Sequence, residues 1–569
     1  MAFLDCCALT FTSLRLRTST MQSRPWLSTF HEFGIPPEIA TLAYCSVTAM
    51  LEEAMLRFAE RPAFHCLGQT LTYAEIDSLS RNFAAWMQDQ GVQRGDRVAV
   101  MLPNILAFPI AMLGIARIGA VQVNVNPLYT PRELEHQLND AGVETIVVFH
   151  GATPTLAEVL PRTSVRRVIT ADMSLRADCS LPASPDDSRL SHSVALADVL
   201  SQGAALPRKP VEQGPDDLLF LQYTGGTTGL SKGAALSHGN LLANCAQFAL
   251  FMPGALRPGE EVVVTAIPLY HIFALMVNFI SYFSVGAENW LVPNPRDMGG
   301  FVEVLRQARP TVLTGVNTLY AGLTRQPGLA DVDWSRLRLS AGGGAAIMPA
   351  VSERWQAITG HFIREGYGLS ETSPIVSFNP AAVSEFTATT GVPMPSSDVK
   401  LVGDDGEEVA VGEPGEICVK GPHVMKGYWN QPEASAAAFM ADGYFRTGDV
   451  GVFDERGFLK IVDRRKDMII VSGFNVYPNE IEAVASDCAG VAECACVGLP
   501  DPRTGEKVAL FVVKSAGSTV SRADIESHCR SALAAYKVPS QIDFIEALPK
   551  STVGKILRRE LRSASPGAA

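Results

Sequence analysis

Residues 218–233 read Leu218-Leu-Phe-Leu-Gln-Tyr-Thr-Gly-Gly-Thr-Thr-Gly-Leu-Ser-Lys-Gly233 and join an apolar run to a loop dense in glycine and hydroxyl groups. The apolar run predicts a buried strand. Glycines let backbone N–H groups approach an anion closely, hydroxyls donate to phosphate oxygens, and a lysine adds a point charge. The loop is not a P-loop, because Ser231 precedes Lys232 and Gly233 follows it. The stretch therefore predicts a phosphate-binding loop of another kind, with candidate contacts Thr224, Gly225, Gly226, Thr227, Thr228, Gly229 and Lys232.

Composition sets wide limits on what this chain is. It has 569 residues, of which 47% are hydrophobic and 19% charged. At roughly 150 residues per domain, this length predicts about three to four domains or subdomains. The composition excludes disorder, collagen and coiled coil as the main architecture. The formal net charge of −12 argues against a general nucleic-acid binder.

The cysteines and apolar runs favour a cytoplasmic protein. Eleven cysteines are scattered without a Cys-x-x-Cys pair, which argues against a zinc site and for reduced thiols. Val262–Ala287 contains no charged residue, but Pro268, His271 and Asn278 interrupt it, so we expect a buried strand and a core helix instead of a membrane span. Residues 1–20 loosely resemble an organelle transit peptide, and an upstream start codon with Met21 as the natural initiator explains them more simply.

Short strands and helices alternate over residues 50–330, which predicts an α/β architecture with largely parallel sheets. Residues 176–216 are polar and proline-rich, so we expect a long surface connection. Residues 390–465 change to short strands with Gly/Pro turns, and the last hundred residues mix strands and helices. Expected strands are Arg97–Leu102, Gly119–Val125, Glu144–Phe149, Lys400–Val402, Gly415–Lys420, Phe458–Val462 and Val508–Lys514, and expected helices include Leu106–Ile118, Pro131–Ala141 and Ser521–Leu533.

The segment Tyr223–Gly233 resembles the nucleotide loop of the adenylate-forming enzymes, a superfamily of acyl-CoA synthetases, luciferase-like proteins and peptide-synthetase adenylation domains. The resemblance extends from about residue 45 to residue 562. It implies a large domain over residues 45–465, built from α/β subdomains and a small β-rich subdomain. A mobile small α+β domain over residues 466–569 follows, and residues 1–44 are set apart as an N-terminal extension.

Two further glycine-containing segments fit the same family. Gly366-Tyr-Gly-Leu-Ser-Glu-Thr372 resembles the family segment whose tyrosine stacks on adenine and whose glutamate helps to hold Mg²⁺. A carboxylate suits this role because Mg²⁺ is a hard cation that prefers oxygen ligands. Ser340-Ala-Gly-Gly-Gly-Ala-Ala346 resembles the glycine turn that borders the adenine and the acyl pocket. The implied contacts are Tyr367, Gly368, Glu371, Thr372, Gly343 and Gly344.

The implied ribose, hinge and thiol contacts follow in the C-terminal third. Tyr444-Phe-Arg-Thr-Gly-Asp449 ends in a carboxylate that can accept hydrogen bonds from both hydroxyls of a cis-diol, as its family counterpart does with ribose. In the segment after it, Arg464 matches a ribose or phosphate contact and Lys466 matches the hinge between the two domains. Gly473 matches a glycine that lines the pantetheine tunnel, where a side chain would obstruct the passage.

The resemblance also implies which residues are catalytic and which line the acyl channel. Lys555 matches the catalytic lysine, which stabilises charge as the carboxylate attacks the α-phosphorus; its basic neighbours Lys550, Arg558, Arg559 and Arg562 are equally compatible with a helix solvated by water. Thr227 and Glu371 are included among the catalytic candidates. His271 matches a residue beside the acyl carboxylate, although a lone histidine is also compatible with a plain core position. Gly315 and Leu275 are expected to line the acyl channel.

Several stretches resemble bacterial long-chain fatty-acid–CoA ligases in particular, notably Asn126–Leu138, Pro268–Leu275, Gly421–Trp429 and Ser472–Glu482. The implied reaction joins a fatty acid to AMP, using ATP and Mg²⁺, and then transfers the acyl group to CoA. Three alternatives stay open: a CoA ligase for medium-chain or aromatic acids, a fatty acyl-AMP ligase without the CoA step, and a nucleotide-binding regulator without turnover. Peripheral contact with the inner face of the membrane is compatible with a fatty substrate. Chain-length preference and oligomeric state are left open.

Overall fold

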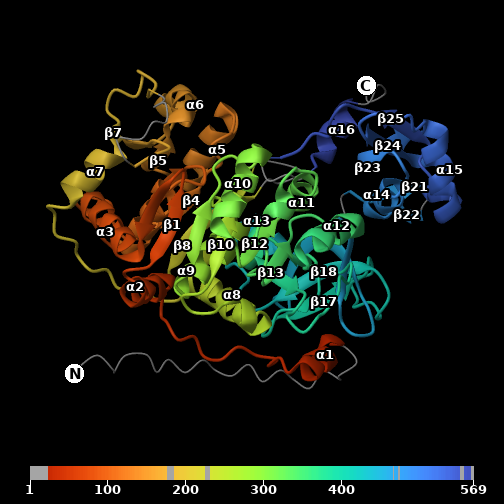
Figure 1. Ribbon diagram of the computed structural model, residues 1–569, viewed down its shortest axis with the longest axis horizontal. Helices are drawn as coiled ribbons and strands as arrows, with labels where there is room; N and C mark the ends of the chain where they lie inside the picture. The colour runs from red at the N-terminus through yellow and green to blue at the C-terminus, as the bar shows by residue number, and fades with distance from the viewer. Residues whose placement is uncertain are drawn as a thin grey trace.

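The computed structural model describes residues 24–175, 185–224, 231–464, 467–471, 474–551 and 556–564. It is a mixed α/β structure with a large N-terminal unit and a smaller C-terminal unit, which confirms the predicted fold class (Figure 1). In Figure 1 the C-terminal unit, drawn in blue, lies to one side of the sheets of the large unit.

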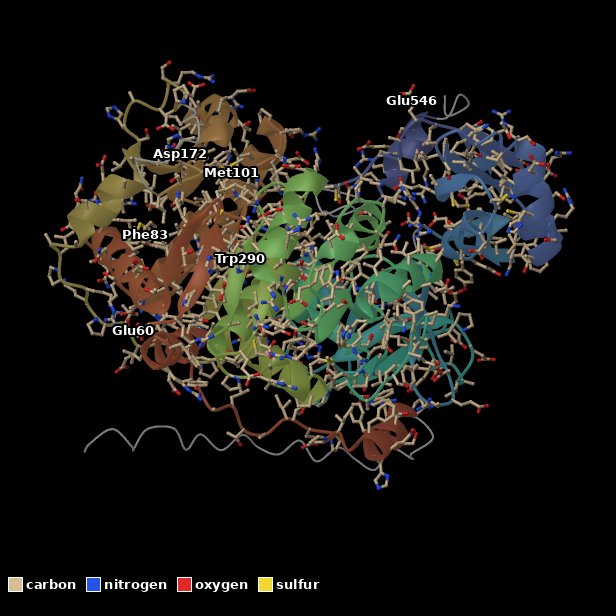
Figure 2. The ribbon with its side chains drawn as sticks, in the orientation of Figure 1. Glu60, Phe83, Met101, Asp172, Trp290 and Glu546 are labelled. Atoms are coloured by element: carbon tan, nitrogen blue, oxygen red, sulfur yellow. The ribbon has the colours of Figure 1, made fainter. Side chains whose placement is uncertain are left out.

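The first sheet has seven strands in the order β7-β6-β5-β3-β4-β8-β9. All neighbours pair in parallel except β8 and β9, which are antiparallel and joined by residues 225–231. Figure 2 labels Met101, which ends β3 and is fully buried. The strands are β3 Arg97–Met101, β4 Val121–Asn124, β5 Thr145–Phe149, β6 Arg167–Ala171, β7 Val194–Ala195, β8 Leu218–Thr224 and β9 Lys232–Ser237.

The second sheet has nine strands in the order β16-β15-β14-β13-β12-β10-β11-β1-β2. Its middle strands are parallel, whereas β2, β15 and β16 pair antiparallel at the two edges. The strands are β1 Pro62–Cys66, β2 Gln69–Thr72, β10 Val262–Thr265, β11 Glu288–Leu291, β12 Val312–Gly315, β13 Leu339–Gly342, β14 Arg364–Gly368, β15 Ile375–Phe378 and β16 Val392–Pro393.

Helices pack against both sheets, and their ends follow from local sequence. Helix α5 starts at a capping box between Thr130 and Glu133, with Pro131 in its first turn, and stops at Gly142 in the left-handed conformation. The predicted helix Pro131–Ala141 is therefore confirmed with both ends. The α-helices of the large unit are α1 Trp26–Phe33, α2 Val47–Arg57, α3 Tyr73–Asp89, α4 Ala107–Arg117, α5 Pro131–Ala141, α6 Thr153–Val159, α7 Leu196–Gly203, α8 His238–Phe251, α9 Tyr282–Ser284, α10 Met298–Ala308, α11 Asn317–Leu323, α12 Pro349–Thr359 and α13 Pro432–Ala438.

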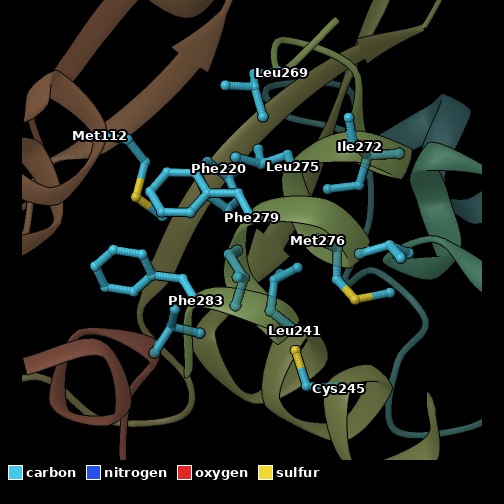
Figure 3. Packing of buried hydrophobic residues seen from close by; sticks show 14 of the residues in the cluster. Met112, Phe220, Leu241, Cys245, Leu269, Ile272, Leu275, Met276, Phe279 and Phe283 are labelled. Carbon is cyan, nitrogen blue, oxygen red and sulfur yellow. The ribbon is translucent and has the colours of Figure 1, made fainter. Parts of the chain in front are cut away.

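The largest hydrophobic cluster includes α4, whose residues are all buried, and the helical segment after His271. The apolar run Val262–Ala287 forms strand β10 and then a buried π-helix, Ala274–Ser281, that continues into α9. This confirms the expected strand and core helix, but the wider π-helical turn was not foreseen. Figure 3 shows Leu275, Met276, Phe279 and Phe283 from this segment packing among other buried side chains.

The surface connection predicted over residues 176–216 is wrong for part of its length. Residues 196–203 form helix α7, which packs against α3. The contact is close: a Cβ on Gly203 would lie 2.0 Å from the backbone oxygen of Asn82, and the indole of Trp86 donates to Gln202. Leu196, Val199 and Leu200 supply the buried face, a short apolar pattern hidden among the prolines around it.

The β-rich subdomain predicted from residue 390 is a four-stranded antiparallel sheet in the order β17-β18-β19-β20. Its strands are β17 Asp398–Val402, β18 Gly415–Lys420, β19 Phe445–Phe453 and β20 Leu459–Arg464. The described part of the N-terminal extension packs onto this sheet: in helix α1, Trp26–Phe33, the ring of Trp26 lies 5.2 Å from that of Phe453. Gly457 makes the contact feasible, since a Cβ there would lie 2.2 Å from the Trp26 backbone nitrogen.

The C-terminal unit is a five-stranded sheet flanked by helices, the small α+β arrangement that the sequence predicts. Long antiparallel strands β23 and β24 form its centre, and β25 pairs with β24 in parallel. The elements are β21 Ile469–Val471, β22 Phe474–Val476, α14 Pro478–Ser486, β23 Val491–Asp501, β24 Gly505–Lys514, α15 Arg522–Ala532, β25 Gln541–Phe544 and α16 Arg558–Ala564.

Candidate active site

The ends of the predicted phosphate loop are held together by the β8–β9 pair. Thr224 and Lys232 are directly paired across these antiparallel strands, so the chain reverses between them. The predicted loop contacts Gly225, Gly226, Thr227, Thr228 and Gly229 lie outside the described residues. A hydroxyl and an ammonium group therefore stand at the two ends of the loop.

Glu371 lies beside the first end of this loop. It belongs to a 3₁₀ turn, Ser370–Thr372, and is 7% exposed. Its Oε1 accepts a hydrogen bond from the Tyr428 hydroxyl at 2.9 Å and lies 3.5 Å from the Thr224 Oγ1. The Lys232 ammonium lies 5.1 Å from the centre of the Tyr428 ring. The fold thus joins residues from three distant segments around one buried carboxylate.

Tyr428 is the residue that reasoning from the sequence missed. Burial, followed by the charge of Glu371 and the hydrogen bond to it, raises the pKa of the Tyr428 hydroxyl, so it stays a donor. The segment Gly421–Trp429 resembles the family, but nothing in the sequence places its tyrosine opposite a carboxylate 57 residues away. Met425 reinforces the contact, because its N–H donates to the Glu371 backbone oxygen at 2.7 Å.

The turn that carries Glu371 depends on two of the predicted contacts. A Cβ on Gly368 would lie 1.9 Å from the Pro374 backbone oxygen, so only glycine fits there. Thr372 is fully buried, and its hydroxyl donates to the backbone oxygen of Pro374 at 2.5 Å and accepts from the Leu369 N–H at 3.0 Å. Both residues shape the turn that presents Glu371.

Tyr367 and Asp449 are brought together although 82 residues separate them. The Tyr367 hydroxyl donates to Asp449 Oδ2 at 2.7 Å, and Asp449 is 5% exposed. On the neighbouring strand Arg464 is its direct partner in the β19–β20 ladder. The predicted adenine-stacking and ribose-binding groups therefore lie in direct contact.

His271 lies in a turn that buried amides hold in place. Its Nδ1 accepts the Phe273 N–H at 3.3 Å, which assigns the proton of the neutral ring to Nε2. The Asn104 Oδ1 accepts the Leu269 N–H at 2.7 Å, and the Gln222 amide donates to the Tyr270 backbone oxygen at 2.9 Å. These contacts tie the backbone of the turn to Asn104 and to Gln222 of β8, the strand that leads into the phosphate loop.

The glycine turn after β13 approaches the histidine segment. A Cβ on Gly343 would lie 3.2 Å from the Gly366 backbone oxygen and 3.5 Å from the Phe273 ring, so three predicted segments converge here. Gly344 has a φ of +77°, a conformation that side chains rarely adopt. The absence of side chains leaves space beside Phe273.

The two predicted channel residues are packed in the interior. Leu275 is fully buried among Leu269 and Ile272 (Figure 3). A Cβ on Gly315 would lie 2.8 Å from the Tyr320 ring and 3.1 Å from Leu319, so a larger residue there would press on Tyr320. The Tyr320 hydroxyl in turn lies 2.9 Å from the backbone oxygens of both Leu313 and Ala341, which makes the ring difficult to displace.

The basic residues near the end of the chain are paired, which overturns the solvated-helix alternative for three of them. Arg558 contacts both carboxylate oxygens of Glu482 at 2.8 Å. Arg562 lies 3.0 Å from Asp467, and Lys550 lies 2.7 Å from Glu493. The predicted functional residues of this region, Lys466, Gly473 and Lys555, lie outside the described residues, as does the side chain of Arg464.

The site suits a cation that receives most of its ligands from a bound phosphate and from water. Within the described ranges no three His, Cys, Asp or Glu side chains gather into a metal-binding group. Mg²⁺ is commonly held by one or two carboxylates together with substrate phosphates and water. Glu371 beside the phosphate loop fits that pattern.

Among the residues that the structure describes, no helix is long and apolar enough to cross a bilayer.

Comparison with known proteins agrees with this geometry. The family model of the AMP-binding enzymes matches residues 51–429, and that of the AMP-binding enzyme C-terminal domain matches residues 480–555. A long-chain-fatty-acid–CoA ligase of Salmonella typhimurium is 46% identical, covering 95% of this chain and 98% of its own. A feruloyl-CoA synthase of Amycolatopsis is 36% identical over 87% of this chain and 94% of its own. The ATP-bound structure of MatB from Rhodopseudomonas palustris superposes with a TM-score of 0.80 at 30% identity, over 91% of this chain and 98% of its own.

Proposed function

This chain belongs to the AMP-binding enzyme family, and on that premise we propose that it is a long-chain fatty-acid–CoA ligase. It activates the fatty acid with ATP to give acyl-AMP and pyrophosphate, and it then forms acyl-CoA with release of AMP. ATP, Mg²⁺ and CoA are the cofactors of this family's CoA ligases. The observation that carries the proposal is the buried carboxylate of Glu371, which the hydroxyls of Thr224 and Tyr428 approach at the end of the phosphate loop.

The described residues mainly bind and orient in this reaction. The phosphate loop and Lys232 take the phosphates, and Glu371 would hold Mg²⁺, which supplies positive charge for the leaving pyrophosphate. Tyr367 and Asp449 take the adenosine, the tyrosine through its ring face and the aspartate through the ribose hydroxyls. His271, protonated on Nε2, can donate to the acyl carboxylate and hold it near the α-phosphorus.

The proposal gives three further residues distinct parts. Lys555 stabilises the charge that develops in the first step, when the carboxylate oxygen bonds to phosphorus and pyrophosphate leaves. Gly473 lines the approach of the CoA thiol in the second step, when sulfur bonds to the acyl carbon and AMP leaves. Lys466 is the hinge that exchanges the two faces of the small domain. We propose that the enzyme is cytoplasmic, and its fatty substrate is compatible with peripheral contact at the inner face of the membrane.

A thiol-consumption assay tests the proposal. Purified protein with ATP, Mg²⁺ and CoA should consume CoA thiol only when a fatty acid is added, with kcat/KM rising from C4 acids toward C16. Pyrophosphate release without thiol consumption would identify an adenylate-only enzyme. Preference for cinnamate or ferulate, which the similarity to a feruloyl-CoA synthase makes the second candidate, would refute the long-chain assignment. No acid-dependent turnover at all would leave a nucleotide-binding regulator.

A further inference from the structure

Strand β8 presents different side chains to its two faces just before the phosphate loop. Successive side chains of a strand point to opposite faces of the sheet. The Thr224 hydroxyl approaches Glu371 of the candidate site. The preceding residue, Tyr223, is buried in the hydrophobic cluster that contains Leu134 and Leu138 of helix α5. The candidate site therefore lies on one side of the strand end, and α5 lies on the other.

Helix α5 holds Tyr223 by its hydroxyl, which donates to Asp140 Oδ2 at 2.6 Å. Burial, followed by the hydrogen bond to Asp140 and the charge of that carboxylate, raises the pKa of the Tyr223 hydroxyl, so it stays a donor. The facing strand confines the ring as well, because a Cβ on Gly233 would lie 2.9 Å from it. The residue that precedes Thr224 is therefore fixed from the side of α5.

Helix α5 also holds the other end of the loop, through His136. The His136 Nε2 lies 2.9 Å from the Ser231 backbone oxygen. Because a carbonyl oxygen only accepts, the ring carries a proton on Nε2 and donates it. Ser231 directly precedes Lys232, which pairs with Thr224 across the β8–β9 ladder. His136 and Asp140 are four positions apart and share one face of the helix, so a single helical turn contacts the neighbours of both loop ends.

The same helix supports the segment that carries Tyr428. Tyr428 pairs with β9 through a single β-bridge, and its hydroxyl donates to Glu371. Two residues later, the side-chain amide of Asn430 donates to the Asp140 backbone oxygen at 3.4 Å. The two hydroxyls that approach Glu371, those of Thr224 and Tyr428, are therefore each within two residues of a contact with α5.

Helix α5 is itself firmly held against the sheet. Gln137 is fully buried, and its amide donates to the Asn124 backbone oxygen at 2.8 Å. At the end of the helix the Arg97 guanidinium donates to the backbone oxygens of Ala141 and Gly142, at 2.9 and 3.0 Å. Such carbonyls lack partners within the helix, so these bonds secure its last turn. A residue bound to α5 is therefore bound to a rigid part of the fold.

We propose that His136 and Asp140 are positioning residues for ATP, because they hold the neighbours of Thr224 and Lys232 in place opposite Glu371. The inference rests on the proposed function, since it concerns the nucleotide used in the first step of that reaction. Both side chains act through other residues, His136 through Ser231 and Asp140 through Tyr223. Acyl-AMP has already lost the pyrophosphate, so the second step does not need this support.

Acid-dependent pyrophosphate exchange tests the part of His136. His136→Ala should raise KM for ATP by about three- to tenfold, the scale of one lost hydrogen bond, and should leave thioester formation from supplied acyl-AMP and CoA within about twofold. His136→Gln can donate from its terminal amide and should recover most of the loss. His528→Ala is the matched control, because His528 Nε2 also contacts a backbone oxygen, that of Val484 at 3.1 Å, in the C-terminal unit. The control should keep the wild-type KM.

Asp140 provides an independent pair of variants. Asp140→Ala removes the acceptor of the Tyr223 hydroxyl and should raise KM for ATP in the same way. Asp140→Asn keeps an acceptor oxygen and should stay near the wild-type value. This pair decides the matter if His136→Ala does not fold.

Three results would overturn the inference while leaving the proposed function in place. They are an unchanged KM for ATP in the folded alanine variants of His136 and Asp140, an equal fall in pyrophosphate exchange and in thioester formation from acyl-AMP, and the same rise in KM in His528→Ala. Absence of acid-dependent pyrophosphate exchange in the unmodified protein would overturn the proposed function and this inference with it.

Discussion

Replacing Tyr428 by phenylalanine removes the hydroxyl that donates to Glu371 at 2.9 Å and leaves the ring in place. The contact of the ring with the Lys232 ammonium, at 5.1 Å, should therefore survive. Glu371 is only 7% exposed, so water has limited access to replace the lost donor. A hydrogen bond to a charged group contributes about 1.5–3 kcal/mol, which corresponds to roughly 10- to 100-fold in a binding or rate constant.

We expect Tyr428→Phe to lower kcat/KM for acid-dependent pyrophosphate exchange by about 10- to 100-fold and to raise the Mg²⁺ concentration needed for half-maximal rate. Tyr444→Phe is the matched control, because the Tyr444 hydroxyl also donates to a carboxylate, that of Asp398, in the β-rich subdomain. The control should keep wild-type exchange rates. Unchanged exchange in Tyr428→Phe, or equal losses in the two variants, would refute the assignment of Tyr428 to the site.

Three further predictions concern other residues. Lys555→Ala should slow adenylation by about 10²–10³ while sparing thioester formation from supplied acyl-AMP, and equal losses in both half-reactions would contradict its role. Gly473→Leu should spare pyrophosphate exchange and cripple thioester formation; a normal thioester rate would remove Gly473 from the thiol path. Burial raises the pKa of Glu365 from 4.5 to about 8. Between these two pH values Glu365 is therefore protonated in the folded chain and ionised in the unfolded chain. Stability should therefore fall as pH rises through the window, by up to about 1.4 kcal/mol per pH unit, and Glu365→Gln should flatten the pH dependence of the thermal midpoint. Identical pH profiles for the two chains would count against that pKa.

Local patterns predicted the elements whose signals lie within a few residues. The helix Pro131–Ala141 carries its own start and stop signals, and the strand Gly415–Lys420 is an apolar run between turns. Helix α7 was missed because its apolar face spans only eight residues in a polar, proline-rich segment and depends on packing against α3. The π-helix has no periodic signature distinct from an α-helix in so uniformly apolar a run.

The sequence alone determined the chemical inventory of this protein: a glycine- and hydroxyl-rich loop after a strand, the carboxylates Glu371 and Asp449, and the order of the units that carry them. These features are local, because backbone freedom, charge and hydrogen-bonding capacity belong to each residue wherever it lies. The folded chain alone shows that Tyr428 donates to Glu371 and that Tyr367 donates to Asp449. Such contacts join residues tens of positions apart, and their geometry follows from strand register and side-chain packing, which a single chain of letters does not specify.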